Sequence, residues 1–140
     1  AEVIAEQTDL TVELDDRLRE INTGVASGKT KDWANQHRNV RTTSDFSIDY
    51  REFEQGETWR EFYSRVCDVM EKMWNEQKRN LLLVSHGCTI GYIIAWWMRF
   101  TPEMLEKAYF SASPGSLSIL TENRYRQHAL TVLNDTSHLQ

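Results

Sequence analysis

A histidine in a short turn between two apolar segments is the residue of this chain best placed to do chemistry. Residues 81–84 form a continuous apolar run, Ser85-His86-Gly87 follows it, and a second apolar run begins at about Thr89. The first run is typical of a strand buried on both faces of a parallel sheet. Because ligands of open α/β sheets bind at the carboxyl ends of the strands, His86 is a candidate functional residue. The alternative is a histidine that only caps the turn through hydrogen bonds to the backbone.

The segment after His86 predicts an anion site at this turn. An apolar helix is expected over about residues 89–100, before Pro102 stops it. The amino terminus of a helix presents unpaired N–H groups and the positive end of the helix dipole. Gly87 and Cys88 lie at that terminus, so we predict that they bind substrate there.

Two other chemistries at the turn are weaker interpretations. Ser85 would need glycines two positions away on both sides to form a nucleophile elbow, and position 83 is Leu83. Cys88 could be a thiolate nucleophile, because a helix amino terminus lowers the pKa of a cysteine. On a tight turn, however, the side chains of Cys88 and His86 need not face each other. The remaining histidines lie in polar surroundings and are predicted at the surface: His37, His128 and His138.

The glycine-rich stretch GVASGKT, residues 24–30, raises the separate possibility of a nucleotide-binding loop. That loop needs four residues between its first glycine and the Gly-Lys pair, and a buried strand in front of it. Only three residues separate Gly24 from Gly28, and the preceding ELDDRLREI is charged and lacks an apolar run. We therefore interpret the stretch as a bend that turns the chain, and we expect no phosphate at Lys29.

The composition fits one domain over residues 1–140 with a real hydrophobic core, since the chain includes five Trp and five Phe. A net charge of −5 argues against nonspecific binding to nucleic acid or to an anionic membrane. The two cysteines have neither a CxxC nor a Cys/His zinc spacing, so a zinc site and a disulfide framework are not expected. No apolar run is long enough to span a membrane, and a cytoplasmic location is the default expectation.

An α/β architecture is expected around the turn. The apolar residues of segment 58–79 fall at three- and four-residue spacing, which predicts an amphipathic helix that Thr58 and Glu61 begin as a capping box. Two short runs, residues 116–120 and 129–133, predict a β-hairpin. With the buried strand and its helix, these elements indicate a three-layer α/β/α sandwich with a mostly parallel sheet and an antiparallel edge strand.

Four segments of the chain carry motifs that are weak singly and specific together. LLLVSHGCTIGYIIAWW combines an apolar run, Ser-His-Gly and an apolar helix, and LREINTG combines Leu-x-Glu with a following glycine. QGETWREFYSRV begins a helix with Gly-Glu-Thr, and LTVLNDTSHL combines a strand with a polar tail. In their order along the chain, of which they span nearly the whole length, they resemble the motifs of the histidine phosphatase superfamily, the phosphoglycerate mutase-like proteins.

The resemblance implies a phosphomonoesterase that works through a phosphohistidine intermediate. In this family the histidine of an Arg-His-Gly motif attacks the phosphoryl group, which splits a hard displacement into two easier steps. His86 would stabilise the charge on the phosphoryl oxygens, and Glu20 would protonate the leaving alkoxide and then deprotonate the incoming water. A small phosphorylated substrate is implied, without metal or cofactor. Without the resemblance, Glu20 would be interpreted as a solvated carboxylate in an acidic run with Asp15 and Asp16.

The chain also departs from the family's pattern. Residues 1–140 contain no Arg-His-Gly motif, Cys88 stands where glycine is common, and Gly91 stands where an arginine often follows. We therefore expect the natural protein to be longer by some tens of residues and residues 1–140 alone to be inactive. Two alternatives stay open. One is a phosphoglycerate mutase, which the compact spacing between Glu20 and His86 disfavours, and the other is a catalytically silent member that binds a phospho-ligand or a partner protein.

Overall fold

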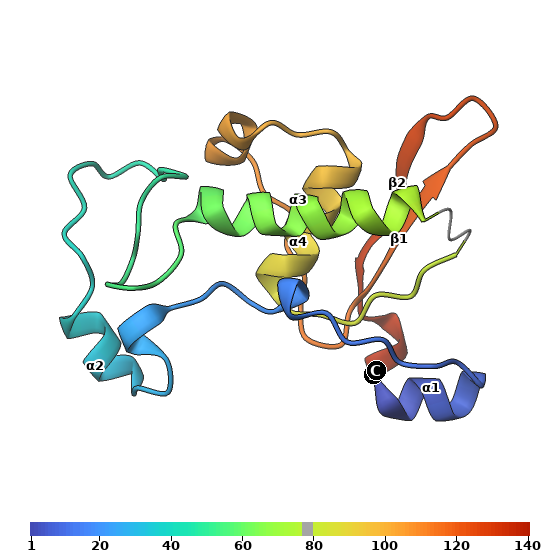
Figure 1. Ribbon diagram of the computed structural model, residues 1–140, viewed down its shortest axis with the longest axis horizontal. Coiled ribbons are helices and arrows are strands. Elements are labelled where there is room, and N and C mark those ends of the chain that lie inside the picture. Colours follow the sequence, from blue (N-terminus) through green and yellow to red (C-terminus); the bar gives the residue numbers. More distant parts are fainter. Residues whose placement is uncertain (77–79) are drawn as a thin grey trace.

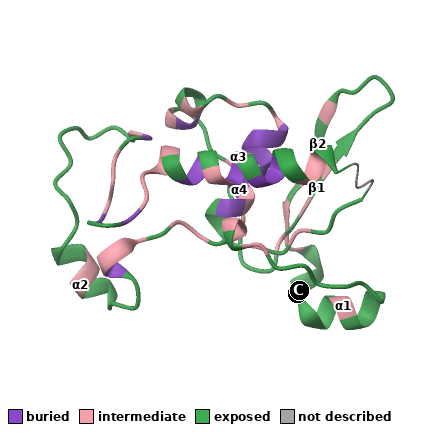
Figure 2. Cartoon of the chain, in the orientation of Figure 1, coloured by how far each residue is buried: buried purple, intermediate pink, exposed green. Residues whose placement is uncertain are grey.

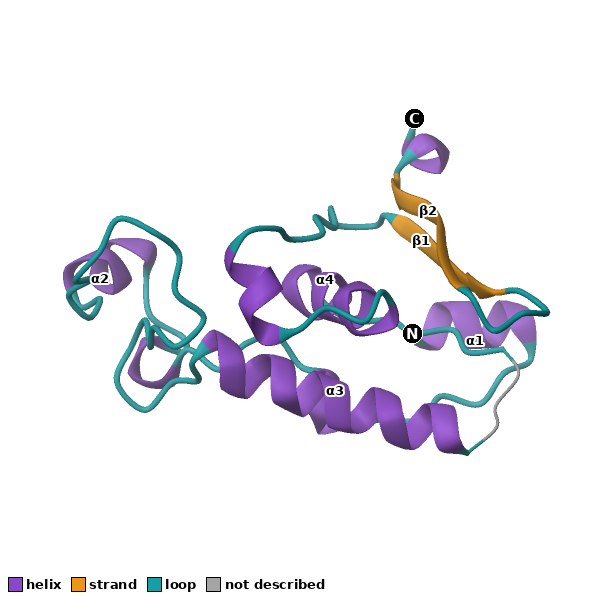
Figure 3. Ribbon diagram, turned by 90° about the horizontal axis from the view of Figure 1, so that it is seen from above, coloured by secondary structure: helices purple, strands orange, loops and turns teal. Residues whose placement is uncertain are grey.

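Two packed helices form the centre of the structure (Figure 1). The structure is a computed structural model, and it describes residues 1–76 and 80–140. They are α3 (Trp59–Asn75) and α4 (Gly87–Trp97), and a hairpin of β1 (Leu117–Glu122) and β2 (His128–Asp135) stands at one end. Seen from above, α4 again lies beside α3, and α2 stands apart at the far end (Figure 3). The shorter helices are α1 (Glu2–Thr8) and α2 (Lys31–Gln36), with 3-10 turns η1 (Asp16–Leu18), η2 (Gly24–Ala26), η3 (Pro102–Glu106) and η4 (Ser137–Leu139).

The amphipathic helix predicted over residues 58–79 is confirmed as α3. Its capping box is complete, because the Glu61 N–H donates to Thr58 Oγ1 at 3.1 Å and the Thr58 N–H donates to Glu61 Oε2 at 2.7 Å. The apolar stripe is buried against the core (Figure 2): Phe62, Tyr63, Val66, Val69 and Met70. The helix ends at Asn75, and residues 77–79 of the predicted segment lie outside the described residues.

The helix α4 is buried along most of its length, which fixes the turn that precedes it. Eight of its eleven residues are buried, and it begins at Gly87, earlier than predicted. A Cβ atom at Gly91 would lie 2.5 Å from the carbonyl oxygen of Phe110, so only glycine lets the chain cross the helix at this point. Neither α4 nor any other helix of the described residues is long and apolar enough to cross a membrane.

The buried parallel strand predicted over residues 81–84 is not formed. The side chains of Leu81, Leu82 and Val84 are 40%, 54% and 51% exposed, and the segment belongs to no strand. A strand requires hydrogen bonds to a neighbouring strand, and no described segment pairs with these residues. The sheet of the described residues contains β1 and β2 alone, so the three-layer sandwich with a mostly parallel sheet stays a prediction.

The predicted hairpin is confirmed, and it packs an unexpected histidine against the core. β1 and β2 pair antiparallel, with Ile119 opposite Val132. His128 begins β2, where its side chain is 11% exposed and its ring stacks on Trp97 at 3.8 Å. His128 Nδ1 lies 2.6 Å from the Trp97 carbonyl oxygen at the end of α4. The surface prediction is therefore wrong for His128, because the hairpin packs on the helix end. The other two histidines outside the turn are exposed, as predicted: His37 and His138.

The glycine-rich stretch is a bend, as predicted. Gly24 has a positive φ of 53°, and a Cβ atom there would lie 2.1 Å from the Glu54 carbonyl oxygen, so only glycine fits this turn. The stretch leads into α2, whose N-cap is Thr30. The Lys29 ammonium lies 5.6 Å from the centre of the Trp33 ring. Lys29 is far in sequence from the turn at residues 85–88.

Candidate active site

The turn at His86 connects the exposed segment 81–84 to α4. His86 is the N-cap residue of α4, with an extended backbone (φ −106°, ψ 165°), and its carbonyl oxygen accepts the Ile90 N–H at 2.8 Å. Its imidazole is exposed and forms no hydrogen bond with the described part of the chain. The alternative in which this side chain only caps the turn is therefore wrong, and the ring is available to a ligand.

Gly87 and Cys88 open α4 beside this ring and are accessible to solvent. A Cβ atom on Gly87 would lie 3.1 Å from the Ala112 carbonyl oxygen, so glycine lets that segment pass close to the helix start. The Cys88 N–H donates to Glu20 Oε2 at 3.1 Å. The helix terminus predicted to bind an anion therefore holds a carboxylate from a residue 68 positions away in sequence.

Two backbone N–H groups donate to the Glu20 carboxylate, and a hydroxyl group lies near it. Besides the Cys88 N–H, the Ile21 N–H donates to Glu20 Oε1 at 3.1 Å, and the Thr89 hydroxyl lies 3.4 Å from the same oxygen. The helix dipole and these donors stabilise a negative charge at this point. No three His, Cys, Asp or Glu side chains of the described residues are grouped so that they could hold a metal ion. All four predicted site residues are brought together at one helix end: Glu20, His86, Gly87 and Cys88.

Sequence reasoning misses the role of two hydroxyl residues that flank the turn. Thr89 is fully buried and donates to the Arg19 carbonyl oxygen at 3.0 Å, and Ser85 donates to the Leu18 carbonyl oxygen at 2.6 Å. Ser85, considered above as a nucleophile, therefore uses its hydroxyl to hold the backbone that carries Glu20. The available signal was Thr89 itself, because a hydroxyl inside an apolar helix needs a hydrogen-bond partner.

The Cys88 thiol is held in its protonated form by its surroundings. Partial burial and the adjacent Glu20 carboxylate raise the pKa of Cys88 to about 11. The expectation that the helix terminus lowers this pKa is therefore wrong. The positive end of the helix is offset by the negative charge of Glu20, which lies against the same N–H group.

Alkylation of Cys88 by iodoacetamide at pH 8 is expected to be on the order of tenfold slower than alkylation of an unstructured cysteine peptide. Only the thiolate reacts, and with a pKa of about 11 its fraction rises as the pH increases toward that value. Mass spectrometry of the labelled peptides separates Cys88 from Cys67, whose pKa is also raised by burial. Glu20→Gln should increase the Cys88 rate, and a wild-type rate equal to that of the peptide would contradict this account.

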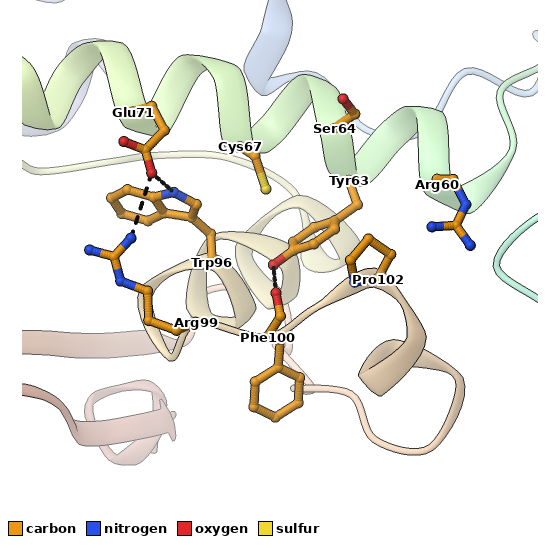
Figure 4. Close-up of a pocket in the computed structure, with 9 residues that line it drawn as sticks. All are labelled: Arg60, Tyr63, Ser64, Cys67, Glu71, Trp96, Arg99, Phe100 and Pro102. Carbon is orange, nitrogen blue, oxygen red and sulfur yellow. Dashed lines mark hydrogen bonds and ion pairs between the residues drawn. The ribbon is translucent and has the colours of Figure 1, made fainter.

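A hollow of about 520 Å³ lies between α3 and the end of α4 (Figure 4). Several of its polar side chains are already paired. The Tyr63 hydroxyl donates to the Phe100 carbonyl oxygen at 2.8 Å, and Trp96 Nε1 donates to Glu71 Oε1 at 3.0 Å. Arg99 lies 3.6 Å from the same Glu71 oxygen. The hollow contains none of the four predicted site residues, so the candidate site stays at the start of α4.

The structure combines helices and a β-hairpin, and a histidine and a carboxylate meet at the start of a buried helix. Compared with protein families, the chain matches the model of the histidine phosphatase superfamily, branch 1, over residues 1–136. The chain belongs to this superfamily. No curated protein matches it.

Two solved structures share the fold. The alpha-ribazole phosphatase from Shigella flexneri superimposes with a TM-score of 0.74 at 21% identity, over 96% of this chain and 66% of that one. A protein proposed to be an alpha-ribazole-5'-P phosphatase from Escherichia coli superimposes with a TM-score of 0.64 at 21% identity, over 90% of this chain and 62% of that one. The chain thus spans less than two thirds of the length of these two proteins.

Proposed function

We propose that residues 1–140 form the larger part of a phosphomonoesterase that hydrolyses a small phosphorylated substrate through a phosphohistidine. The observation that carries the proposal is the contact of Glu20 with the Cys88 N–H, at the helix end where His86 stands. An acid, a histidine and helix N–H groups at one point are the groups that phosphoryl transfer uses for proton transfer and for charge stabilisation.

In the proposed first step, a histidine nitrogen forms a bond to phosphorus while the bond from phosphorus to the alkoxide oxygen breaks. His86 and the N–H groups of Gly87 and Cys88 stabilise the charge on the phosphoryl oxygens. A phosphoryl oxygen that accepts the hydrogen bond from the Cys88 N–H replaces Glu20 as its acceptor. The Glu20 carboxyl group then lies beside the alkoxide oxygen that leaves. Glu20 gives its proton to the alkoxide as the bond from phosphorus to the alkoxide oxygen breaks.

In the proposed second step, water attacks the phosphohistidine. Glu20, now ionised, takes a proton from the water. The water oxygen forms a bond to phosphorus, and the bond from phosphorus to histidine breaks. Inorganic phosphate leaves, Glu20 is protonated again, and the nucleophilic histidine is free. One carboxyl group thus serves as acid and then as base, so its position relative to the phosphoryl group decides both steps.

The nucleophilic histidine is proposed to come from a segment outside residues 1–140. His37 and His128 stack on tryptophan rings away from the turn, and His138 lies in η4. The exposed apolar residues Leu81, Leu82 and Val84 support a further strand that would pair there and carry the nucleophile. The greater length of the two similar structures is consistent with such a segment.

The test of this function is phosphate release from a panel of phosphomonoesters, including alpha-ribazole phosphate, by the full-length protein in the presence of a metal chelator. We expect release and an acid-labile phosphohistidine that forms on the enzyme during turnover. Interconversion of phosphoglycerates without phosphate release would instead indicate a mutase. Neither activity, with inorganic phosphate still bound, would favour the catalytically silent alternative.

A further inference from the structure

We propose that Arg65 positions the acid Glu20, and that Glu57 holds Arg65 in place for this task. The catalytic part of the inference rests on the proposed function, whereas its structural part rests on the contacts of residues 17–22 alone. Arg65 lies on α3, far in sequence from the turn that carries His86.

The segment that carries Glu20 is held by side chains. Beyond the 3-10 turn η1, its backbone belongs to no helix or strand. Four consecutive carbonyl oxygens, those of residues 17–20, each accept a hydrogen bond from a side chain. Arg65 donates to three of them: Arg17 at 2.6 Å, Arg19 at 3.2 Å and Glu20 at 3.4 Å.

The guanidinium of Arg65 uses all five of its N–H groups in this arrangement. Three bind the carbonyl oxygens of Arg17, Arg19 and Glu20, and the other two bind Glu57, with Nε at 2.8 Å from Oε1 and Nη2 at 2.7 Å from Oε2. The side chains of Arg65 and Glu57 are only 21% and 19% exposed, and the guanidinium lies 4.8 Å from the centre of the Phe62 ring. A lysine ammonium cannot reproduce this planar fork of donors.

Glu57 fixes the other end of the same segment. Its Oε2 accepts the Asn22 N–H at 2.8 Å, and its own N–H donates to the Asn22 carbonyl oxygen at 2.8 Å. Burial acts to raise the pKa of Glu57, but the hydrogen bonds from Arg65 and Asn22 outweigh it and hold the pKa below its ordinary value. The ion pair therefore stays charged at neutral pH, and its contribution to stability is lost only when acidification protonates Glu57.

Helices α3 and α4 thus hold the backbone of residues 17–20 from two sides. Ser85 and Thr89 bind it from the turn and α4, and Arg65 binds it from α3. The Glu20 carboxylate reaches the Cys88 N–H only while this backbone keeps its place. A shift of about 1 Å at a catalytic group can cost a hundredfold in rate, so the guanidinium is expected to affect chemistry as well as stability.

The first test needs no catalysis. In full-length Arg65→Lys, Glu20 should move away from Cys88, and iodoacetamide should alkylate Cys88 about as fast as in Glu20→Gln, roughly threefold faster than in the wild type, because burial still raises the pKa of the thiol. The matched control is Arg60→Lys, an arginine of α3 that is also paired with carboxylates but does not contact residues 17–20. Unchanged alkylation of Cys88 in a folded Arg65→Lys protein would overturn the proposal.

The second test uses the leaving group. Up to departure of the leaving group, only a substrate whose alkoxide needs a proton depends on Glu20, so Arg65→Lys should lower kcat/KM for an alkyl phosphate by about 10- to 100-fold and that for p-nitrophenyl phosphate by less than about threefold. The double variant with Glu20→Gln should show little further loss. Equal losses for both substrates would mean that Arg65 acts on the fold alone.

A further variant and a thiol control keep both tests decisive. If Arg65→Lys also speeds alkylation of Cys67 on α3, the fold of that variant has loosened. Glu57→Gln is then tested instead of Arg65→Lys, because the amide keeps the shape of the carboxylate. Glu57→Gln with wild-type Cys88 labelling and no leaving-group dependence would then overturn the proposal. A full-length protein without phosphatase activity would refute the proposed function, and the Cys88 labelling would still decide whether Arg65 positions Glu20.

Discussion

Glu20→Gln is expected to lower kcat/KM of the full-length protein for an alkyl phosphate by about 100- to 10,000-fold, with a far smaller loss for p-nitrophenyl phosphate. The amide has no acidic proton to give, and an alkoxide leaves poorly without one, whereas nitrophenolate leaves unaided. Because kcat/KM reports the steps up to departure of the first product, the later water step does not obscure the comparison. Steady-state rates with the two substrates measure the effect.

The same variant should show a burst of nitrophenol in rapid mixing. The first step proceeds with p-nitrophenyl phosphate, but no base then activates water, so the phosphohistidine accumulates. Asp16→Asn is the matched control, because it makes the same charge change on a carboxylate of η1 that is 91% exposed. A Glu20→Gln protein that loses equal activity on both substrates and gives no burst would rule out the acid and base roles.

Sequence alone indicated the histidine half of the site better than the acid half. His86, Gly87 and Cys88 follow one another, so a single pattern of apolar run, turn and apolar helix was enough to predict them. Glu20 could be chosen only through the family resemblance, because its contact with Cys88 joins residues 68 positions apart. Composition and periodicity carry no information on such a contact.

The elements that depend on local patterns were predicted, and those that depend on distant partners were not. α3 and the hairpin formed where periodicity and capping placed them. The strand over residues 81–84 did not form, because a strand needs a neighbouring strand as well as apolar side chains. The burial of His128 likewise depends on where the hairpin meets the end of α4, which no local pattern reveals.

The hydrogen bonds that hold the backbone of residues 17–20 also depend on residues that are distant in sequence. Glu57 and Arg65 stood in the segment that resembles a family helix start, yet nothing in their spacing indicated that they reach the backbone beside Glu20. Their low exposure and the use of every guanidinium N–H identify them only once the fold is known. Residues that position a catalytic group through backbone contacts are therefore harder to find from sequence than the group itself.

His86→Ala is expected to lower kcat/KM of the full-length protein by about 100- to 1,000-fold, and by the same factor for alkyl and nitrophenyl substrates. This ring is proposed to stabilise charge on the phosphoryl oxygens, which develops whichever alcohol leaves. Its exposure and its lack of hydrogen bonds to the described chain predict an unchanged thermal unfolding midpoint.

The comparison of His86→Ala with Glu20→Gln separates charge stabilisation from proton transfer. The first loss should be independent of the leaving group and the second should depend on it, although both side chains lie at one helix end. His138→Ala, an exposed histidine in η4, should keep wild-type rates. A His86→Ala protein with wild-type kcat/KM would remove His86 from the mechanism, and a loss confined to alkyl phosphates would reassign it to proton transfer.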